Sequence, residues 1–458
     1  MHRKGKVVKS IRHFFHNMTH TRIIALGYLL MVLFGTLLLM LPMATAEGER
    51  TGFFTALFTA TSASCVTGLV VVDTATHWTI FGQGVLLLLI QIGGLGYMTL
   101  GVLLALALKR RITLRVRGLL QDSMNYMQQG GIEHLVSVAI RGTLITEGVG
   151  ALLLMIRFIP MFGVGKGVFY GIFHAISAFC NGGFDLFGTY SGEYSSLGAF
   201  NDDPLVILTV SALILIGGLG FVVWSDVRRR KFKFRKLMLH SKLVLTMSAI
   251  LVVGGTLLFW IFERDNLLFG LSLKEQFLGA LFSSVTARTA GFNSIDTGSL
   301  TSASKFLTIV FMFIGGCPGS TAGGMKTVTV MVLLVFLWSN FRGKKGSEIF
   351  GRRLEQDAIV KATTVITVTL LLTVVATLGL TYLEPDKMFI DLFFEVVSGI
   401  GTVGMSTGIT RDLCFVSKVI LVICMYCGRI GSMSFALFFT ESQKKVPLEK
   451  PVEKVLIG

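Results

Sequence analysis

The sequence predicts an all-α polytopic membrane protein that is built from four tandem units. Its 458 residues are 52% hydrophobic and 15% charged, with a mean hydropathy of +0.73, which is typical of a chain that crosses a bilayer several times. A glycine-containing turn also recurs at intervals of 108 to 115 residues, at Gly68, Gly183, Gly291 and Gly404. So regular a period indicates internal duplication.

The duplication extends upstream of each glycine. Equivalent residues stand fourteen, ten and six positions before it: Phe54, Phe169, Phe277 and Ile390; Phe58, Phe173, Leu281 and Phe394; and Ser62, Ser177, Val285 and Ser398. A spacing of four places them on one face of a helix. We therefore expect short helices near residues 53–63, 168–179, 276–286 and 389–398, each too short to cross the bilayer. Glycines at helix packing contacts are the alternative, but packing alone would not preserve these offsets.

The turns that follow the short helices are predicted to form an ion selectivity filter. Backbone carbonyls can replace the hydration shell of a cation where glycine permits the required backbone conformation. Non-helical backbone at membrane depth is tolerated where protein or a water-filled pore satisfies it. The short helices are then pore helices around one pathway with pseudo-fourfold symmetry. The predicted filter residues are Cys65, Val66, Thr67 and Gly68; Cys180, Asn181, Gly182 and Gly183; Arg288, Thr289, Ala290 and Gly291; and Gly401, Thr402, Val403 and Gly404.

Lys/Arg runs separate the repeats and indicate which parts of the chain face the cytoplasm. By the positive-inside rule, every inter-unit segment and both termini are cytoplasmic, so each helix–pore helix–helix unit crosses twice and the total is eight transmembrane helices. The predicted second crossings of units one, two and four cover residues 80–108, 204–224 and 415–439. The boundaries are a basic N-terminus at 1–22, units at 23–118, 119–236, 237–357 and 358–443, and a C-terminus at 444–458.

The second crossing of unit three is interrupted within residues 314–324. Five glycines and a proline in this stretch rule out a continuous helix. We interpret it as a gating loop that obstructs the ion path; a kink that accommodates neighbouring helices is the alternative. The loop residues are Gly315, Gly316, Cys317, Pro318, Gly319, Ser320, Thr321, Ala322, Gly323 and Gly324.

Three cationic residues fall within or beside membrane segments. Arg429 is predicted to complete the gate, because a guanidinium near mid-membrane repels cations and needs a cavity or a partner. The loop carbonyls could neutralise it, or it could be an anchor paired with Glu395 or Glu147. Lys326 is expected to extend toward the cytoplasm, and Arg288 to brace the third turn, against a carboxylate such as Glu395.

Acidic residues follow all four turns and favour a cation as substrate. Asp73, Asp185, Asp296 and Asp412 lie on the side opposite the Lys/Arg runs, where negative charge concentrates cations at a pore mouth. The net charge of +16 follows the positive-inside pattern, so we expect no nucleic-acid partner. Enzyme signatures such as HExxH, GxSxG and a P-loop lysine are absent from the sequence. We therefore expect that this chain is not an enzyme and binds no cofactor.

These features together resemble the Trk/Ktr/HKT superfamily of potassium transporters, most of all the membrane subunit of bacterial Ktr systems. The resemblance rests on the four units, the turns at Val66–Gly68 and Thr402–Gly404, the 286–292 segment, the broken helix of unit three and the Gly428-Arg429 pair. The second turn, Asn181-Gly182-Gly183, departs from it because it lacks Thr or Val.

The resemblance implies a multi-pass protein of the bacterial plasma membrane that takes up K⁺, with Na⁺ as a possible modulator. It also implies a homodimer with one pore in each subunit and a cytoplasmic ring of nucleotide-binding regulatory subunits of the KtrA type. A secondary transporter that couples K⁺ to Na⁺ or H⁺ by alternating access is the alternative, because interrupted helices also form such substrate sites. Inverted repeats would favour that alternative, whereas these four units run in the same sense.

Overall fold

The structure is a computed structural model that describes residues 19–96, 118, 132–344 and 346–431. Each unit begins with a long apolar helix and continues with a shorter one. The long helices are α2 (His20–Leu39), α8 (Ile132–Phe162), α13 (Leu239–Glu263) and α17 (Gln356–Leu383). The pore helices are α3 (Phe53–Ser64), α9 (Val164–Phe179), α14 (Leu273–Thr286) and α18 (Phe389–Gly401). The predicted helix–pore helix order is therefore present four times.

The third part of each unit is a returning segment that contains one or two helices. These helices are α5 (Ile80–Leu95), α11 (Pro204–Gly218) with α12 (Phe221–Arg229), α15 (Ser302–Ile314) with α16 (Thr327–Phe341), and α19 (Phe415–Ile430). Among the described residues, four helices are long and apolar enough to cross a membrane, or five if the bent pair α11–α12 is one span. The count of eight crossings stays a prediction.

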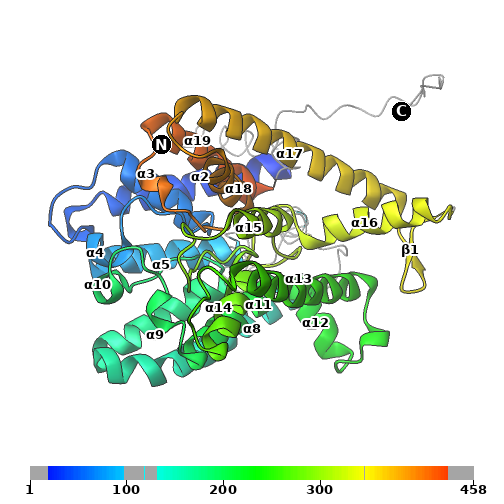
Figure 1. The fold of residues 1–458 in the computed structure, drawn as a ribbon, viewed down its shortest axis with the longest axis horizontal. Coiled ribbons are helices and arrows are strands. Elements are labelled where there is room, and N and C mark those ends of the chain that lie inside the picture. The colour runs from blue at the N-terminus through cyan, green and yellow to red at the C-terminus, as the bar shows by residue number, and fades with distance from the viewer. Residues whose placement is uncertain (1–18, 97–117, 119–131, 345, 432–458) are drawn as a thin grey trace, which may run out of the picture.

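Small elements occupy the connections between these helices. They are α4 (Thr74–His77), α10 (Gly188–Ser191), the 3₁₀ turns η1 (Pro42–Ala44), η2 (Gly198–Phe200), η3 (Phe234–Lys236) and η4 (Ile409–Arg411), and an antiparallel hairpin of β1 (Glu348–Ile349) and β2 (Arg352–Arg353) that pairs Glu348 with Arg353. In Figure 1, α4 and α10 lie at one end of the molecule, whereas α12 and the hairpin lie at the opposite end.

In every unit a helix of the returning segment ends within two residues of a glycine with positive φ, and not only in unit three. Gly96, Gly220, Gly315 and Gly431 follow these helix ends with φ of 79°, 94°, 70° and 93°, a region that glycine enters without steric cost. In unit two the helix turns by 92° between α11 and α12. The expectation of an unbroken crossing over 204–224 was therefore wrong. In units one and four the helices end at Leu95 and Ile430, and residues 97–108 and 432–439 lie outside the described residues.

Local sequence explains where several helices begin. Asp203 caps α11 by accepting from the Leu205 and Val206 amides at 2.9 and 3.4 Å, and Pro204 fills the first helical position, where its missing N–H costs nothing. Ser272 and Glu275 form a reciprocal capping box on α14. These caps fix the starting points of a returning helix and a pore helix.

The pore helices form the interior and the long helices form the outer shell. The side chains of Phe58, Phe173 and Phe394, ten residues before their filter glycines, are fully buried. Large apolar side chains on the long helices are exposed, among them Leu30, Leu152, Val253 and Leu371, as expected of a surface in contact with lipid. The first and last units adjoin, with α19 against α2 and α3 (Figure 1), and the Tyr426 hydroxyl donates to Ala25 O at 2.6 Å.

Candidate functional site

The four predicted turns share one backbone conformation. The residue two positions before each filter glycine has a positive φ: Val66 56°, Asn181 60°, Thr289 75° and Thr402 49°. The glycines follow with φ of 99°, 69°, 81° and 88° for Gly68, Gly183, Gly291 and Gly404. A left-handed backbone is an outlier for the β-branched residues Val and Thr, and it persists only where the surroundings impose it. Four occurrences at equivalent positions indicate one structural unit.

The turns close into a ring in chain order. A Cβ atom added to any filter glycine would strike a carbonyl oxygen of the next turn, and the fourth turn adjoins the first. The contacts are Gly68 to Gly182 O at 2.8 Å, Gly183 to Ala290 O at 2.9 Å, Gly291 to Val403 O at 2.6 Å, and Gly404 to Thr67 O. Because carbonyls of all four turns meet around one axis, the ring can contact a single cation from four sides.

Hydroxyl groups of the pore helices hold the turns in place. Ser62 Oγ accepts from the Gly68 amide at 3.0 Å, and Ser398 Oγ accepts from the Gly404 amide at 3.1 Å. In unit two, Ser177 Oγ donates to Phe184 O at 2.8 Å and accepts from the Phe184 amide at 3.1 Å. Unit three has Val285 at this position, and the neighbouring Thr286 hydroxyl donates to Phe292 O at 2.6 Å instead.

The second turn is joined to the third through a side chain. Asn181 Nδ2 donates to Thr289 Oγ1 at 3.1 Å. This bond accounts for the residue that departs from the Thr/Val pattern. Among the described residues, the buried hydroxyls of Thr67 and Thr402 and the Oδ1 atom of Asn181 have no hydrogen-bond partner. Buried polar atoms are normally satisfied, so these three oxygens remain available to a ligand or water.

One side of the ring opens into a cavity of about 140 Å³ that all four filter glycines line. We call it the vestibule. Asp73, Asp185 and Asp296 also line it, whereas the exposed Asp412 does not. The predicted acidic mouth therefore contains three of the four aspartates. The pKa of the Asp185 carboxyl is raised to about 7, chiefly because burial disfavours the charged form; the hydrogen bond from the Phe187 amide opposes this shift, and the nearby Asp73 adds to it.

The interrupted segment of unit three lies on the other side of the ring. Its Thr321 hydroxyl donates to Phe179 O, the last carbonyl of pore helix α9, at 3.1 Å. The Cys317 amide donates to Gly218 O at 3.2 Å, and Gly319 O accepts from the Phe221 amide at 2.9 Å. The backbone groups of the interrupted segment cannot form helical hydrogen bonds, and unit two supplies partners for several of them.

The same loop packs tightly against the fourth turn. A Cβ atom at Gly324, whose φ is +68°, would lie 2.9 Å from Gly401 O, and one at Gly323 would strike the Thr402 side chain. These contacts leave no room for a side chain at either position. The loop glycines therefore permit close approach to the base of the ring.

Arg429 joins the loop to unit one. Its Nη1 donates to Thr321 O at 2.7 Å, and its Nη2 donates to Gly93 O and, at 3.3 Å, to Gly94 O. Its Nε donates to the Tyr28 hydroxyl at 3.3 Å. One of these carbonyls, Thr321 O, belongs to the loop and two belong to unit one, so neutralisation of this guanidinium by the loop's carbonyls stays a prediction. The alternative anchor to Glu395 or Glu147 was wrong: the Glu395 carboxylate binds Ser406, Thr407 and Thr410, and Glu147 accepts from Gln91 at 3.3 Å.

Comparison with known proteins identifies the family. The family profile described as "TrkH: Cation transport protein" matches residues 9–447. The chain belongs to the TrkH family. It is 41% identical to the potassium/sodium uptake protein NtpJ of Enterococcus hirae, over 95% of this chain and 97% of that protein. It is 38% identical to the Ktr system potassium uptake protein B of Bacillus subtilis, over 96% of each chain.

A solved structure shows the same fold. The potassium transporter TrkH from Vibrio parahaemolyticus superposes with a TM-score of 0.68 at 21% sequence identity, covering 90% of this chain and 84% of that one. Together with the apolar long helices, this match establishes the predicted fold class, an all-α membrane protein of the TrkH family.

Two further cationic residues of this TrkH-family chain contact the loop, contrary to expectation. Lys326 does not extend away from the protein: its Nζ donates to Ala322 O at 2.5 Å and to Gly323 O at 3.2 Å. Arg288 is buried, and its Nη2 donates to Ser248 Oγ at 2.9 Å and to Cys317 Sγ at 3.8 Å, not to Glu395. Sequence reasoning missed Lys326 because its position next to the break was also compatible with an exposed helix end.

Proposed function

We propose that this chain conducts K⁺ selectively through the ring of four turns. The closed ring carries the proposal, because carbonyls of all four turns meet around one axis, where they can replace the hydration shell of a cation. Three aspartates in the vestibule support a cation as the substrate. The relatives named as potassium or potassium/sodium uptake proteins support K⁺ as that cation, with Na⁺ as a modulator.

The loop of unit three and Arg429 form the gate in this proposal. The loop covers the inner base of the ring, and its backbone and Arg429 together contact residues of units one, two and four. Opening requires the loop to move, which breaks the hydrogen bond between Arg429 and Thr321 O. The ring itself keeps its conformation, because its hydroxyl braces come from the pore helices.

The vestibule faces outward and the basic segments face the cytoplasm. The segment from Arg228 to Lys236 begins in the last turn of α12, which lies at the end of the molecule opposite α4 and α10 (Figure 1). Its seven basic residues support a cytoplasmic position by the positive-inside rule. With the four-unit repeat, this supports a cytoplasmic position for both termini in a bacterial cell and a location of the chain in the plasma membrane.

We further propose that the chain works as a homodimer with a cytoplasmic nucleotide-binding regulatory ring, and as a transporter without enzymatic activity. The name of the Bacillus subtilis relative, protein B of a Ktr system, supports a multi-component assembly. Regulation by nucleotide then comes from the partner, since the sequence of this chain contains no P-loop lysine.

Ion flux into proteoliposomes that contain the purified chain tests the function. We expect K⁺ flux to exceed Na⁺ flux and to be independent of an imposed Na⁺ gradient. The alternative, a symporter with alternating access, is favoured by the interruptions in the returning segments of units two and three. Flux that requires the Na⁺ gradient would establish that alternative, and equal flux of both ions would contradict selectivity.

A further inference from the structure

Two pore-helix side chains make the same hydrogen bond beyond the filter glycine. His174 and Glu395 each stand nine residues before the glycine of their unit. His174 Nε2 accepts from the Leu186 amide at 3.2 Å, and Glu395 Oε1 accepts from the Thr407 amide at 3.0 Å. Leu186 and Thr407 each stand three residues after their glycine. The two units therefore hold the vestibule-side part of the turn in the same way, with chemically different side chains.

The surroundings of His174 fix its protonation state. Its Nδ1 lies 2.7 Å from Tyr170 O, and a carbonyl only accepts, so Nδ1 carries the proton. Nε2 is then the acceptor for the Leu186 amide. The ring is fully buried and stacks on Phe187 with centroids 4.2 Å apart. A neutral histidine with both nitrogens bonded satisfies this apolar site.

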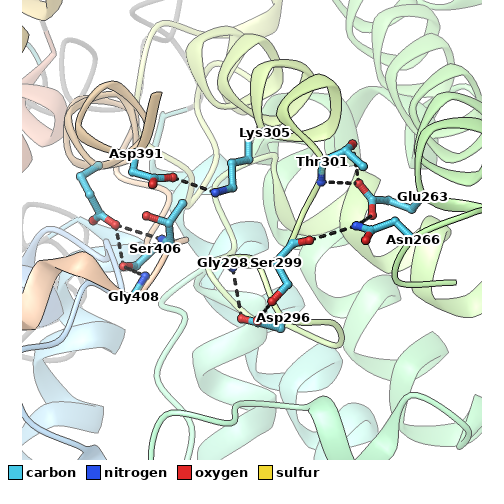
Figure 2. Close-up of polar contacts among 12 residues, drawn as sticks. Glu263, Asn266, Asp296, Gly298, Ser299, Thr301, Lys305, Asp391, Ser406 and Gly408 are labelled. Atoms are coloured by element: carbon cyan, nitrogen blue, oxygen red, sulfur yellow. Dashed lines mark hydrogen bonds and ion pairs between the residues drawn. The ribbon is translucent and has the colours of Figure 1, made fainter. Parts of the chain in front are cut away.

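Glu395 holds a longer segment than His174 does. Its fully buried carboxylate also accepts from the Ser406 hydroxyl at 2.6 Å and the Thr410 hydroxyl at 2.5 Å. Ser406 and Thr410 line the vestibule. One turn earlier on α18, Asp391 binds Lys305 of α15 at 2.9 Å (Figure 2), which fixes the pore helix against unit three. Glu395 is thus held on a constrained helix and in turn fixes the segment that follows Gly404.

Units one and three do not have this bond. The equivalent residues are Thr59, whose hydroxyl donates to Thr55 O of its own helix at 2.8 Å, and Phe282, which is apolar. Because the turns adjoin in chain order, units two and four stand opposite each other across the ring. The two braces are therefore arranged with twofold symmetry within a ring of fourfold conformation.

We propose that His174 and Glu395 are positioning residues that set ion discrimination by holding the second and fourth turns from the vestibule side. The inference rests on the proposed K⁺-selective pore. Removing either acceptor leaves a buried backbone N–H without its partner, so the segment must rearrange to satisfy it. The carbonyl groups around Gly183 or Gly404 then shift, which lowers the ratio of K⁺ to Na⁺ permeability. The gate on the other side of the ring is unchanged.

The test compares H174L and E395L with H174Q and E395Q in proteoliposomes, by the ratio of K⁺ to Na⁺ permeability. Leucine removes the acceptor, whereas glutamine retains a carbonyl oxygen near the same place. We expect the leucine variants to lose about tenfold in this ratio, equivalent to about 1.4 kcal/mol, and the glutamine variants to lose less.

A matched control comes from a second buried carboxylate. Glu263, at the end of α13, accepts from the Thr301 amide and hydroxyl at 2.9 and 2.8 Å and from Asn266 Nδ2 at 2.7 Å, and it is not a vestibule residue (Figure 2). E263Q and E263L should lower thermal stability without changing the permeability ratio. If a leucine variant does not fold, a reduced ratio in the matching glutamine variant supports the inference.

Two results would contradict different claims. Folded H174L and E395L with the wild-type ratio, or E263L with an equal loss of ratio, would overturn the role of the two braces and leave the proposed function intact. A wild-type protein without K⁺ preference would instead contradict the proposed function.

Discussion

The two sides of the ring differ in how far they obey the repeat. On the vestibule side, all four turns have a positive φ at the filter glycine and at the residue two positions before it. On the loop side the described residues differ from unit to unit: unit three contributes the loop at 315–324, and Arg288 of unit three and Arg429 of unit four contact it. Equal contacts from four sides suit the replacement of a symmetric hydration shell. An obstruction of the ion path requires a single element on the axis, because four identical elements would clash with one another there.

The largest expected effect comes from breaking the symmetric side. Gly68→Ser places an L-residue at φ +99° and brings Cβ to 2.8 Å from Gly182 O. Left-handed strain of about 1–2 kcal/mol should reduce the K⁺ to Na⁺ permeability ratio by about tenfold or more. Gly404→Ser should have a comparable effect, because its position is equivalent. A wild-type ratio in both variants would rule out the turns as the filter.

A second large effect should come from the asymmetric side. Arg429→Gln removes a charged donor set from Thr321 O, Gly93 O and Gly94 O. Charge-assisted bonds are worth about 1.5–3 kcal/mol each, so the loop should open more often and K⁺ flux in proteoliposomes should rise. The permeability ratio should stay unchanged. Lower flux with a lower ratio would show that Arg429 supports the filter rather than the gate.

The sequence revealed those parts of this site that depend on residue type and spacing. The filter glycines were found from their period, and the loop from its glycines and proline. The left-handed backbone of Val66 and Thr289 could not be predicted from the sequence. Tertiary contacts impose this conformation, and β-branched residues do not indicate it. The break at Gly220 was missed because single glycines are also common within membrane helices.

Lys326→Met should give a smaller effect in the same direction as Arg429→Gln. The lysine bonds Ala322 O and Gly323 O, both within its own loop, so its removal loosens the loop without freeing it from units one and two. We expect a rise in K⁺ flux below that of Arg429→Gln, measured in the same vesicles. A rise larger than that of the arginine variant would assign the main gate contact to Lys326.

The smallest expected effect concerns charge in the vestibule. Since the pKa of Asp185 is raised to about 7, its carboxylate is charged at pH 8 and mostly protonated at pH 6. Acidifying the vestibule side should therefore lower K⁺ flux at low K⁺ concentration, because less negative charge attracts cations. Asp185→Asn should have lower flux at pH 8 and a weaker pH dependence. Unaltered pH dependence in this variant would exclude Asp185 as the titrating group.

The most direct test of the division between filter and gate is to delete residues 316–323 and to measure K⁺ flux and the K⁺ to Na⁺ permeability ratio on the same proteoliposomes. The deletion removes the loop that contacts Phe179 O and the fourth turn, and leaves the four ring segments and their serine braces in place. We predict higher flux with an unchanged ratio. Unchanged flux would show that the loop is only a kink, and a lost ratio would show that selectivity depends on the loop as well as on the ring.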